Sequence, residues 1–586
     1  TGGGKSLCYQ LPCLLQPSIN IVVCPIKSLM YDQYDNLVNI FINNLHFITS
    51  DLEQKEKQKI ESKFEKGNYL LVWISPEKFQ IPNFRDKISA IVTNFSIAYA
   101  VVDEVHCLSE WGHDFRTSYL NLAKTIDKLS PKDEKGEGKI KFIGLTATAS
   151  VNVLKDIKIE FARQKQSIED ENIKSLLDYS REELFFEVIY DNGNKFNQLI
   201  KIINNLRDKE NFTISDDKAG IVFTPNVNGE YGCYNIANKL NKIYQNQVNY
   251  FSGSVPTTFN GEFKEPIMSN NEFNEYKIKI QKDFKENKYK LLVATKSFGM
   301  GIDKQNIFYT FHYGIPSSLE ALYQEAGRAG RWDIRKIENK NKIAKCFVLF
   351  SPESIERKKI DKLFHKDTTF TKLQDIIDEV GYNGKDIFKQ FFLFVQRHND
   401  IEIDFNIILK LIKTYFKENT QVKIFWTEAR NKLKINNDIL EKAIYRLSIL
   451  GIVSDWTTDF INQYEVQFDT INEEHIIKSL SYYINKYEPD TDLSKALKQV
   501  VGNSILEKAI RYLLKWTFEN IVYNRKQSLK TLYDLCLEFK DNNHFKQRIN
   551  SYFIFSERTF VLQHIAENTK NYEKWFEVLT INNNNV

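Results

Sequence analysis

Two adjacent carboxylates, Asp103 and Glu104, follow a strand-like stretch of the chain. Residues 99–102, Tyr-Ala-Val-Val, have the length and β-branched content of a buried parallel strand. The carboxyl edge of an open parallel sheet is where ligands bind. An acid pair at that edge can divide one task, because one carboxylate can hold Mg²⁺ while the other positions or deprotonates an attacking water. The alternative is a pair that only caps the next helix.

A phosphate-binding loop is predicted at the start of the chain. Residues 1–6 read Thr-Gly-Gly-Gly-Lys-Ser and precede an apolar helix predicted over 7–15. Lys5 offers a charge for the β and γ phosphates, the Ser6 hydroxyl can ligate Mg²⁺, and the helix N-terminus adds its dipole. The backbone N–H groups that would turn toward the phosphates are those of Gly2, Gly3 and Gly4. The first glycine of the usual pattern would lie before residue 1, so we expect the natural protein to begin upstream.

A third candidate element covers residues 323–331, Tyr-Gln-Glu-Ala-Gly-Arg-Ala-Gly-Arg. Arg328 and Arg331 are three residues apart and can share one helix face, which we expect to point into a cleft between two lobes. An arginine there would neutralise charge on a transferring γ-phosphoryl group. Arginines at this spacing are often only a solvated face. The glycine-rich strand-to-loop stretch at 294–303 favours the functional interpretation.

Length and composition limit the class of protein. The 586-residue chain is long enough for three or four domains, and its 42% hydrophobic and 27% charged content is typical of a soluble globular protein without a membrane span. Its 80 basic and 76 acidic residues give a net charge of +4, so any nucleic-acid site must be a local patch. The seven cysteines contain no CxxC pair, which predicts a reducing compartment and argues against structural zinc. We expect the cytoplasm for a prokaryotic source and the nucleus for a eukaryotic one.

The elements that must position these residues form two α/β lobes. Strands alternating with helices predict a doubly wound parallel sheet in a first lobe, 1–163, and a similar second lobe, 184–352, with a cleft between them. In the first lobe we predict strands within 19–28, 69–74, 99–102 and 141–145, and a helix over 29–42. In the second lobe we predict strands over 220–223, 248–251, 290–295, 308–313 and 346–350. Residues 164–183 are expected to connect the lobes, and residues 254–275 to form a mobile insertion.

The rest of the chain is predicted to be mostly helical. A helical connector covers 353–436, and residues 437–470 carry the pattern of a winged helix: a helix ended by Gly451, then strands over 452–456 and 464–468. A small α+β core without a nucleic-acid role is the alternative. The turn between the strands would display Phe460 and Ile461, either as a wedge against a base pair or tucked into the protein. The helical region 471–586 carries no assignable function.

Seven motifs in family order and spacing resemble the RecQ family of DNA helicases, within the second helicase superfamily. They are TGGGKSLCYQLP (1–12), VVCPIKSLMYDQ (22–33), ISPEKF (74–79), VVDEVHCLSEWGHDFR (101–116), LTATA (145–149), ATKSFGMGID (294–303) and YQEAGRAGR (323–331). The resemblance implies two tandem RecA-like lobes and an ATP-dependent enzyme that unwinds DNA in the 3′→5′ direction.

The resemblance also implies roles for individual residues. By it, Lys5 and Ser6 bind phosphate and Mg²⁺, Asp103 binds Mg²⁺ through water, Glu104 is the catalytic base and His106 links the nucleotide site to the second lobe. Further nucleotide-site residues are Gly301, Asp303 and Gln324. Residues that couple DNA to hydrolysis are Trp111, Phe115, Arg116, Thr146 and Thr148. Phe460, on the predicted turn, is the further DNA-contacting residue, expected to act in strand separation. The γ-phosphate contacts are Arg328 and Arg331, with Arg331 predicted as the arginine finger.

The sequence departs from the family pattern at three places. The acid box reads DEVH where DEAH is commoner, a change at a position expected only to pack. The four-cysteine zinc module expected after the second lobe is absent, since Cys346 and Cys536 are the only cysteines beyond Cys233. No structural zinc is therefore expected. Trp332 follows Arg331 where a charged Asp and a Gly are expected, and the sequence offers no physical reason for it.

Three functions follow from the sequence. The first is an ATP-driven helicase that acts on single-stranded DNA and on tailed or branched duplexes, in repair or recombination or in a mobile-element or phage-defence setting. The second is a translocase on nucleic acid, including RNA, that does not separate strands. The third is a DNA-binding scaffold with an inactive ATPase, against which intact Lys5, Asp103, Glu104 and Arg331 argue. Protein partners cannot be read from the sequence.

Overall fold

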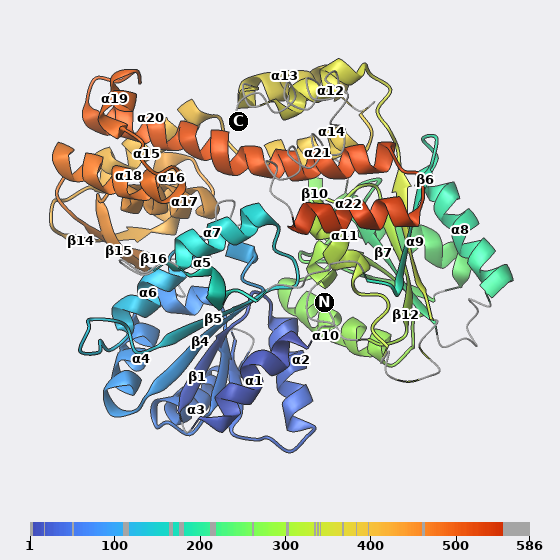
Figure 1. The fold of residues 1–586 in the computed structure, drawn as a ribbon, viewed down its shortest axis with the longest axis horizontal. Helices are drawn as coiled ribbons and strands as arrows, with labels where there is room; N and C mark the ends of the chain where they lie inside the picture. Colours follow the sequence, from blue (N-terminus) through green and yellow to red (C-terminus); the bar gives the residue numbers. More distant parts are fainter. Residues whose placement is uncertain are drawn as a thin grey trace.

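Two parallel β-sheets and a large C-terminal region make up the computed structural model (Figure 1). The predicted class, two tandem parallel-sheet lobes followed by a mostly helical region, is confirmed. The structure describes residues 4–16, 18–49, 52–108, 117–162, 168–174, 181–210, 218–245, 247–260, 263–299, 304–332, 336, 339, 342–365, 368–381, 384–396, 398–459 and 463–554.

The first lobe has a five-stranded parallel sheet in the order β2-β3-β1-β4-β5. Its strands are β1 Ile19–Val23, β2 Leu45–Ile48, β3 Leu71–Ile74, β4 Ile97–Asp103 and β5 Lys141–Leu145. Its helices are α1 Lys5–Leu15, α2 Lys27–Val38, α3 Gln54–Glu65, η1 Pro76–Gln80, α4 Pro82–Asn94, α5 Thr117–Leu120, α6 Leu122–Leu129 and α7 Val151–Phe161. One apolar core joins the sheet to α1 and α2, and a second joins it to α3, α4, α6 and α7. Both faces are thus covered, as a parallel sheet requires.

The second lobe has a six-stranded parallel sheet in the order β6-β13-β12-β7-β11-β8. Its strands are β6 Leu184–Tyr190, β7 Ala219–Thr224, β8 Val248–Phe251, β11 Leu291–Thr295, β12 Ile307–Tyr313 and β13 Ala344–Phe350. Its helices are α8 Lys195–Glu210, α9 Cys233–Tyr244, α10 Asn270–Lys285, η4 Lys296–Gly299 and α11 Leu319–Ala326. The predicted insertion at 254–275 contains an antiparallel pair, β9 Thr257–Asn260 and β10 Phe263–Pro266, and the start of α10.

The C-terminal region begins with α12 Arg357–Phe364, α13 Phe370–Val380 and α14 Asp386–Val395. It continues with α15 Ile401–Tyr415, β14 Gln421–Phe425, α16 Trp426–Leu433, α17 Asn437–Ile449, β15 Val453–Thr458 and β16 Gln463–Phe468. It ends with α18 Glu473–Tyr487, α19 Leu493–Lys498, α20 Ile505–Thr517, the π-helical segment η7 Phe518–Val522, α21 Tyr523–Leu537 and α22 Asn542–Ile554. Strand β14, which the sequence did not predict, pairs with β16 in an antiparallel sheet of order β14-β16-β15. The winged-helix assignment stays a prediction, and Phe460 and Ile461 lie outside the described residues.

Buried charges fix α14 to the end of the second lobe, in the region where the sequence lacks the zinc module. Lys195 Nζ lies 2.5 Å from Asp191 and 3.2 Å from Asp386, the first residue of α14. The Glu353 carboxylate accepts backbone N–H groups at the start of the same helix, at 2.8 Å from Lys385. Satisfying the free N–H groups of a helix start stabilises the helix. Ionic and capping contacts therefore attach this segment to the sheet.

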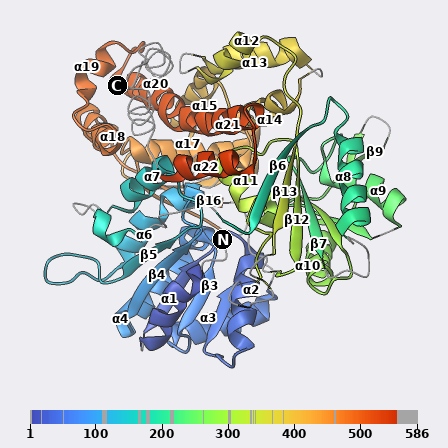
Figure 2. The same cartoon turned by 45° about the vertical axis from the view of Figure 1, so that its right-hand side comes forward.

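The C-terminal region contacts both lobes. The apolar core of residues 405–516 packs as one unit, and this unit reaches the first lobe through Asp455, whose carboxylate accepts from Arg85 at 2.9 Å and from Lys128 at 2.7 Å. Tyr487 adds a hydrogen bond to Glu160 at 2.6 Å. Helices α21 and α22 instead share the core of the second lobe and lie across α11 (Figures 1 and 2). The region therefore bridges the lobes.

The segment after α11 differs from the sequence prediction for Arg328 and Arg331, and it explains the presence of Trp332. Helix α11 ends at Ala326, so Arg328 and Arg331 follow the helix and do not share one of its faces; that prediction is wrong. Gly327 and Gly330 interrupt the helix, and Gly330 has a φ of +66°, which favours glycine. Trp332 is buried and stacks on Phe308 with ring centroids 4.7 Å apart, so this unusual residue fills the core of the second lobe.

In the part of the chain that the structure describes, none of the helices is both long enough and apolar enough to cross a membrane.

The Asp455 contact is expected to hold the 405–516 unit on the first lobe. Replacing Asp455 by Asn removes the charge that faces Arg85 and Lys128, and should cost about 1–2 kcal/mol of docking free energy. Hydrogen exchange of the amides of β15 should accelerate. Burial raises the pKa of Asp455, but Lys128 and Arg85 outweigh burial and hold it below its usual range. The stabilisation is therefore present above about pH 4 and is lost as the pH falls through the lowered pKa.

A matched control is Glu465→Gln, because Glu465 pairs with Lys423 inside the three-stranded sheet at 3.4 Å. The control should leave exchange in β15 close to that of the unchanged protein. Equal exchange in the two variants would show that the Asp455 contacts do not hold the 405–516 unit on the first lobe.

Candidate active site

The start of α1 has the geometry of a phosphate-binding turn. Gly4 adopts a left-handed conformation, with φ of +74°, and an added Cβ would meet no atom within 4 Å. Helix α1 begins at Lys5 without a side-chain cap, so its first N–H groups are not capped by a side chain. Ser6 lies in the first turn of the helix, and Gly2 and Gly3 lie outside the described residues. This turn is open and carries the positive end of a helix dipole.

The two predicted acids lie at the carboxyl end of β4, an interior strand of the first sheet between β1 and β5. Asp103 and Glu104 are 4% and 8% exposed. Asp103 accepts from the Gln33 side chain at 2.7 Å and from the Glu104 backbone N–H at 2.9 Å. Glu104 has a φ of +50°, a left-handed conformation that is uncommon for a residue with a side chain. Such strain is found at functional turns, where the surrounding structure maintains it.

Lys5 is the direct partner of Glu104. Its Nζ lies 2.8 Å from Glu104 Oε1, so the predicted loop and the predicted acid pair meet in the structure. Burial acts to raise the pKa of Glu104, but the positive charge of Lys5 outweighs burial and lowers it. Burial and the charge of Glu104 raise the pKa of Asp103, with Lys5 and Gln33 opposing the shift. Of the two acids, Glu104 is held in the ionised form that can accept a proton from water.

Gln33 is a site residue that the sequence reasoning did not assign, although it ends one of the quoted motifs. Its Oε1 accepts from Tyr9 OH at 2.7 Å and from Trp73 Nε1 at 2.7 Å. These two donors fix the amide orientation, so Nε2 must face Asp103. The network comes from α1, α2 and β3, and no local sequence signal joins these residues. It orients the Asp103 carboxylate from behind, as outer-shell partners orient metal ligands.

His106 lies between the acids and the second lobe. Its Nδ1 is 3.3 Å from Glu104 Oε2 and 2.8 Å from Thr146 Oγ1. Its Nε2 is 2.8 Å from the amide nitrogen of Gln324, which also donates to Thr148 Oγ1 at 2.6 Å. With Nε2 accepting from Gln324, the ring proton is on Nδ1 and faces Glu104. A continuous path of contacts therefore runs from Lys5 to α11 in the other lobe.

The two predicted arginines have different surroundings. Arg328 is 4% exposed, and its positive charge is one of those that lower the pKa of Glu104. Arg331 donates from Nε to the carbonyl oxygen of Gly327 at 3.0 Å. The structure thus brings the charge of Arg328 to bear on the acid pair, and the role of Arg331 as the finger stays a prediction.

Several predicted residues lie outside the described part of the chain. These are Gly2, Gly3, Trp111, Phe115, Arg116, Gly301, Asp303 and Phe460. Within the described part, no group of three or more His, Cys, Asp and Glu side chains is arranged to hold a metal ion. The expected absence of zinc stays a prediction.

The chemistry of the site suits a nucleoside triphosphate with Mg²⁺. A hydroxyl at Ser6 and a carboxylate at Asp103 are the hard oxygen ligands that Mg²⁺ prefers. The open turn at Gly4, where no atom approaches the Cβ position, leaves room for a phosphate beside the start of α1. The donor set therefore fits the predicted ligands.

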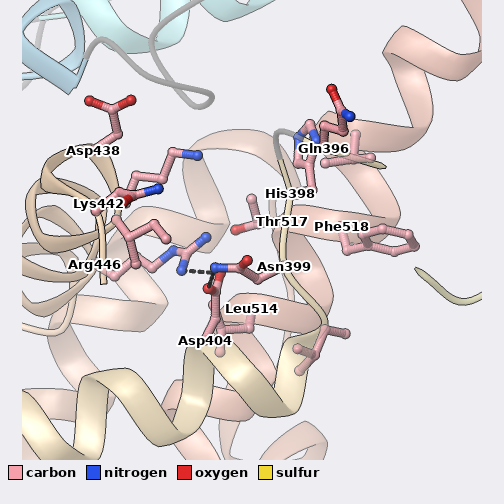
Figure 3. A pocket seen from close by; sticks show the side chains of 14 residues that line it. Gln396, His398, Asn399, Asp404, Asp438, Lys442, Arg446, Leu514, Thr517 and Phe518 are labelled. Carbon is pink, nitrogen blue, oxygen red and sulfur yellow. Dashed lines mark hydrogen bonds and ion pairs between the residues drawn. The ribbon is translucent and has the colours of Figure 1, made fainter. Parts of the chain in front are cut away.

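Two cavities lie elsewhere in the molecule. One of about 730 Å³ is bounded by the carboxyl edge of the second sheet, by α14 and by α21, with Thr224, Thr295 and Arg525 among its lining residues. Another of about 360 Å³ lies between α17 and the π-helical segment. Figure 3 shows Lys442 and Arg446 pointing into this second cavity, with Arg446 paired to Asp404 at 2.5 Å. Neither cavity is lined by Lys5 or the acid pair.

The contact between Gln33 and Asp103 is expected to set the affinity for Mg²⁺. Replacing Gln33 by Leu removes the donor to Asp103, so the carboxylate should become a poorer ligand and the Mg²⁺ concentration for half-maximal nucleotide binding should rise by roughly 10-fold. Fluorescence of a labelled ATP analogue, titrated with Mg²⁺, measures this.

Trp73→Phe is the matched control, because it removes one of the two donors to Gln33, leaves Tyr9 to hold the amide orientation and keeps the bond from Gln33 to Asp103. Its Mg²⁺ requirement should stay within about twofold of that of the unchanged protein. This change is smaller than the one expected when a metal ligand loses its outer-shell partner. An unchanged Mg²⁺ requirement in Gln33→Leu would contradict the assignment.

Comparison with known proteins adds the family. The family described as DEAD/DEAH box helicase matches residues 1–157, and the helicase conserved C-terminal domain matches residues 194–333. The ATP-dependent DNA helicase RecQ of Bacillus subtilis is 27% identical over 549 residues, which cover 88% of this chain and 82% of that protein. The ATP-dependent DNA helicase Q5 of Mus musculus is 30% identical over 410 residues, 67% of this chain and 38% of that protein. The chain thus spans less than half of the length of the mouse relative.

Among solved structures, the helicase Lhr of Mycobacterium smegmatis, bound to single-stranded DNA and AMP-PNP, covers 82% of this chain and 56% of its own, with 11% identity and a TM-score of 0.42. The two helicase domains in order, the relatives named RecQ and the meeting of Lys5 with the acid pair agree with one another. The chain belongs to the RecQ family of ATP-dependent DNA helicases.

Proposed function

We propose that this protein hydrolyses ATP to move 3′→5′ along single-stranded DNA and to separate duplex strands, in DNA repair or recombination. The observation that supports this most is the path from Lys5 through Glu104 and His106 to Gln324. It joins the predicted phosphate loop of one lobe to α11 of the other. A change of charge at the nucleotide can therefore alter the contact between the lobes, which is what a translocating motor needs. The protein would work where cellular DNA is, in the cytoplasm of a prokaryote or in a nucleus.

Each residue of the predicted nucleotide site has a distinct chemical task. Ser6 and Asp103 would hold Mg²⁺, which supplies charge neutralisation on the phosphates. Glu104 accepts the proton of the attacking water, and Arg328 or Arg331 offers positive charge to the γ-phosphoryl group. Lys5 is paired with Glu104 in this structure and is also the predicted phosphate ligand. If the Lys5 ammonium moved to a phosphate, the Glu104 carboxylate would be free to accept a hydrogen bond from the attacking water. Binding of ATP would therefore release Glu104 to act as the base.

Contact between the lobes would follow the state of Glu104. The carboxylate faces His106 Nδ1, and the other ring nitrogen faces Gln324. Protonation or movement of Glu104 changes the hydrogen bond that His106 makes on its other side. An ion pair between Lys285 of α10 and Asp32 of α2 is a further direct link between the lobes.

Replacing Glu104 by Gln tests the base. The amide keeps the shape of the side chain but does not take up the proton, so ATP binding should persist while turnover falls by about 100-fold or more. Steady-state hydrolysis with saturating single-stranded DNA measures turnover, and a labelled ATP analogue measures binding. Hydrolysis at the unchanged rate would mean that another group is the base.

Strand separation and polarity need a separate test. Duplexes with a 3′ tail, a 5′ tail or blunt ends, made of DNA or RNA, should be offered with ATP and Mg²⁺. We expect unwinding of the 3′-tailed DNA duplex, and hydrolysis stimulated by single-stranded DNA. Stimulated hydrolysis without strand separation would support the alternative, a translocase, and stimulation by RNA alone would change the substrate class.

A further inference from the structure

Helix α11 presents two buried polar side chains on one face. Glu320 and Gln324 are four residues apart, so they lie one above the other on the helix, and each is 4% exposed. Gln324 faces the first lobe, where it contacts His106 and Thr148. Glu320, one turn nearer the start of the helix, points toward the C-terminal helices. The position of Gln324 therefore depends on what holds Glu320.

Two hydroxyl groups from distant parts of the chain hold the Glu320 carboxylate. Ser528 of α21 donates to Oε2 at 2.6 Å, and Tyr552 of α22 donates to Oε1 at 2.6 Å. The Ser528 hydroxyl also accepts the backbone N–H of Leu319, the first residue of α11, at 3.3 Å. Ser528 thus supplies a cap to the start of α11 from another element. Hydrogen bonds to a charged group are among the stronger ones in proteins.

Tyr552 also reaches the first lobe. It lines the same cavity as Ser150, the residue that precedes α7. Burial and the charge of Glu320 raise the pKa of Tyr552 well above its ordinary value. The phenol therefore keeps its proton at neutral pH and stays a donor to the carboxylate. Tyr552 therefore holds Glu320 beside the first lobe.

Packing supports the same arrangement. The ring of Phe553, on α22, lies 5.2 Å from that of Tyr323 on α11. Side chains of α21 and α22 share one apolar core with Leu319, Leu322 and Ala326. The C-terminal helices lie across α11 in both views (Figures 1 and 2). Because α11 is short and entirely buried, a shift at Glu320 moves Gln324 with it.

We propose that Ser528 and Tyr552, acting through Glu320, are positioning residues for Gln324, so that α21 and α22 are a working part of the nucleotide site. The proposal rests on the function proposed above and extends it to a region whose sequence gave no function. Neither residue touches the predicted substrate. Their effect is to keep the Gln324 amide within hydrogen-bond distance of His106 and Thr148, the arrangement in which the lobes are joined.

Tyr552→Phe removes the hydroxyl and keeps the ring. The kcat of DNA-stimulated ATP hydrolysis should fall by about 10-fold, the size expected for one hydrogen bond to a charged group, while the KM for ATP changes less than about twofold. ATP binds to Lys5 and the first lobe, which the variant leaves intact. Ser528→Ala should have the same direction of effect.

Tyr190→Phe is the matched control. Tyr190 OH donates to the carbonyl oxygens of Cys536 and Leu537 at 3.2 Å and 3.0 Å, so it joins α21 to the same lobe away from α11. This control loses a phenol in the same interface, and its kcat should remain that of the unchanged protein. A loss of kcat in both variants would indicate general weakening of the interface and would overturn the proposal.

A double-mutant cycle tests whether Tyr552 acts through Gln324. In a Gln324→Ala background, Tyr552→Phe should have no further effect on kcat, because the group that it positions is gone. A full 10-fold effect in that background would show that Tyr552 acts by another route and would contradict the proposal.

Hydrogen exchange separates failure of the proposal from failure of the proposed function. The amides of 319–326 should exchange faster in Tyr552→Phe than in Tyr190→Phe and the unchanged protein, whether or not ATP is hydrolysed. An unchanged protein without DNA-stimulated hydrolysis would refute the proposed function, and the exchange result would still decide whether Tyr552 holds α11. Equal exchange in all three proteins would overturn the positioning role.

Discussion

Two neighbouring carboxylates buried at the end of β4 are the constraint on which the rest of the site depends. Like charges at this distance repel, and burial adds to the cost of keeping either ionised. The compensating groups come from separate elements: Lys5 from α1, Gln33 from α2, and Arg328 from the second lobe. Compensation is therefore complete only when α1, β4 and the second lobe are in place together. A site built in this way responds to any ligand that takes one of the compensating charges away.

The sequence predicted those parts of the site that local spacing specifies. A glycine-rich turn before a helix and an acid pair after a buried strand are readable in one window, and the structure brings Lys5 and Glu104 to 2.8 Å. The support behind Asp103 was not readable, because Tyr9, Gln33 and Trp73 lie on three elements and meet only through the sheet order. Polar networks of this kind depend on tertiary packing and leave no periodic pattern in the chain.

Physical reasons also explain why the sequence did not predict β2, β6 and β14. β2 is only four residues long and includes His46, and in β14 only Ile424 is buried, so neither carries a continuous apolar run. β6 at the edge of its sheet alternates buried and more exposed residues, unlike the predicted strand β7, which is buried throughout. The prediction that Arg328 and Arg331 share a helix face was wrong for a different reason, because it extended the helix through Gly327 and Gly330. There the carbonyl oxygen of Gly327 is satisfied by Arg331 and Arg181, not by a further helical turn.

The C-terminal region makes the relation between the lobes a property of the whole chain. Residues 505–537 form one helical rod, α20, η7 and α21, whose first part belongs to the unit docked on the first lobe and whose last part packs on the second. The π-helical stretch Phe518–Val522 lies between the two attachments, beside the cavity at Arg446. π-Helical turns are rare and occur mostly as single turns within α-helices, frequently at functional sites. If the lobes open, the rod must bend there or release one attachment, and bending keeps both apolar cores buried. Because the rod is attached to both lobes, the separation of the lobes, and with it the path from Glu104 to Gln324, depends on the distant C-terminal contacts.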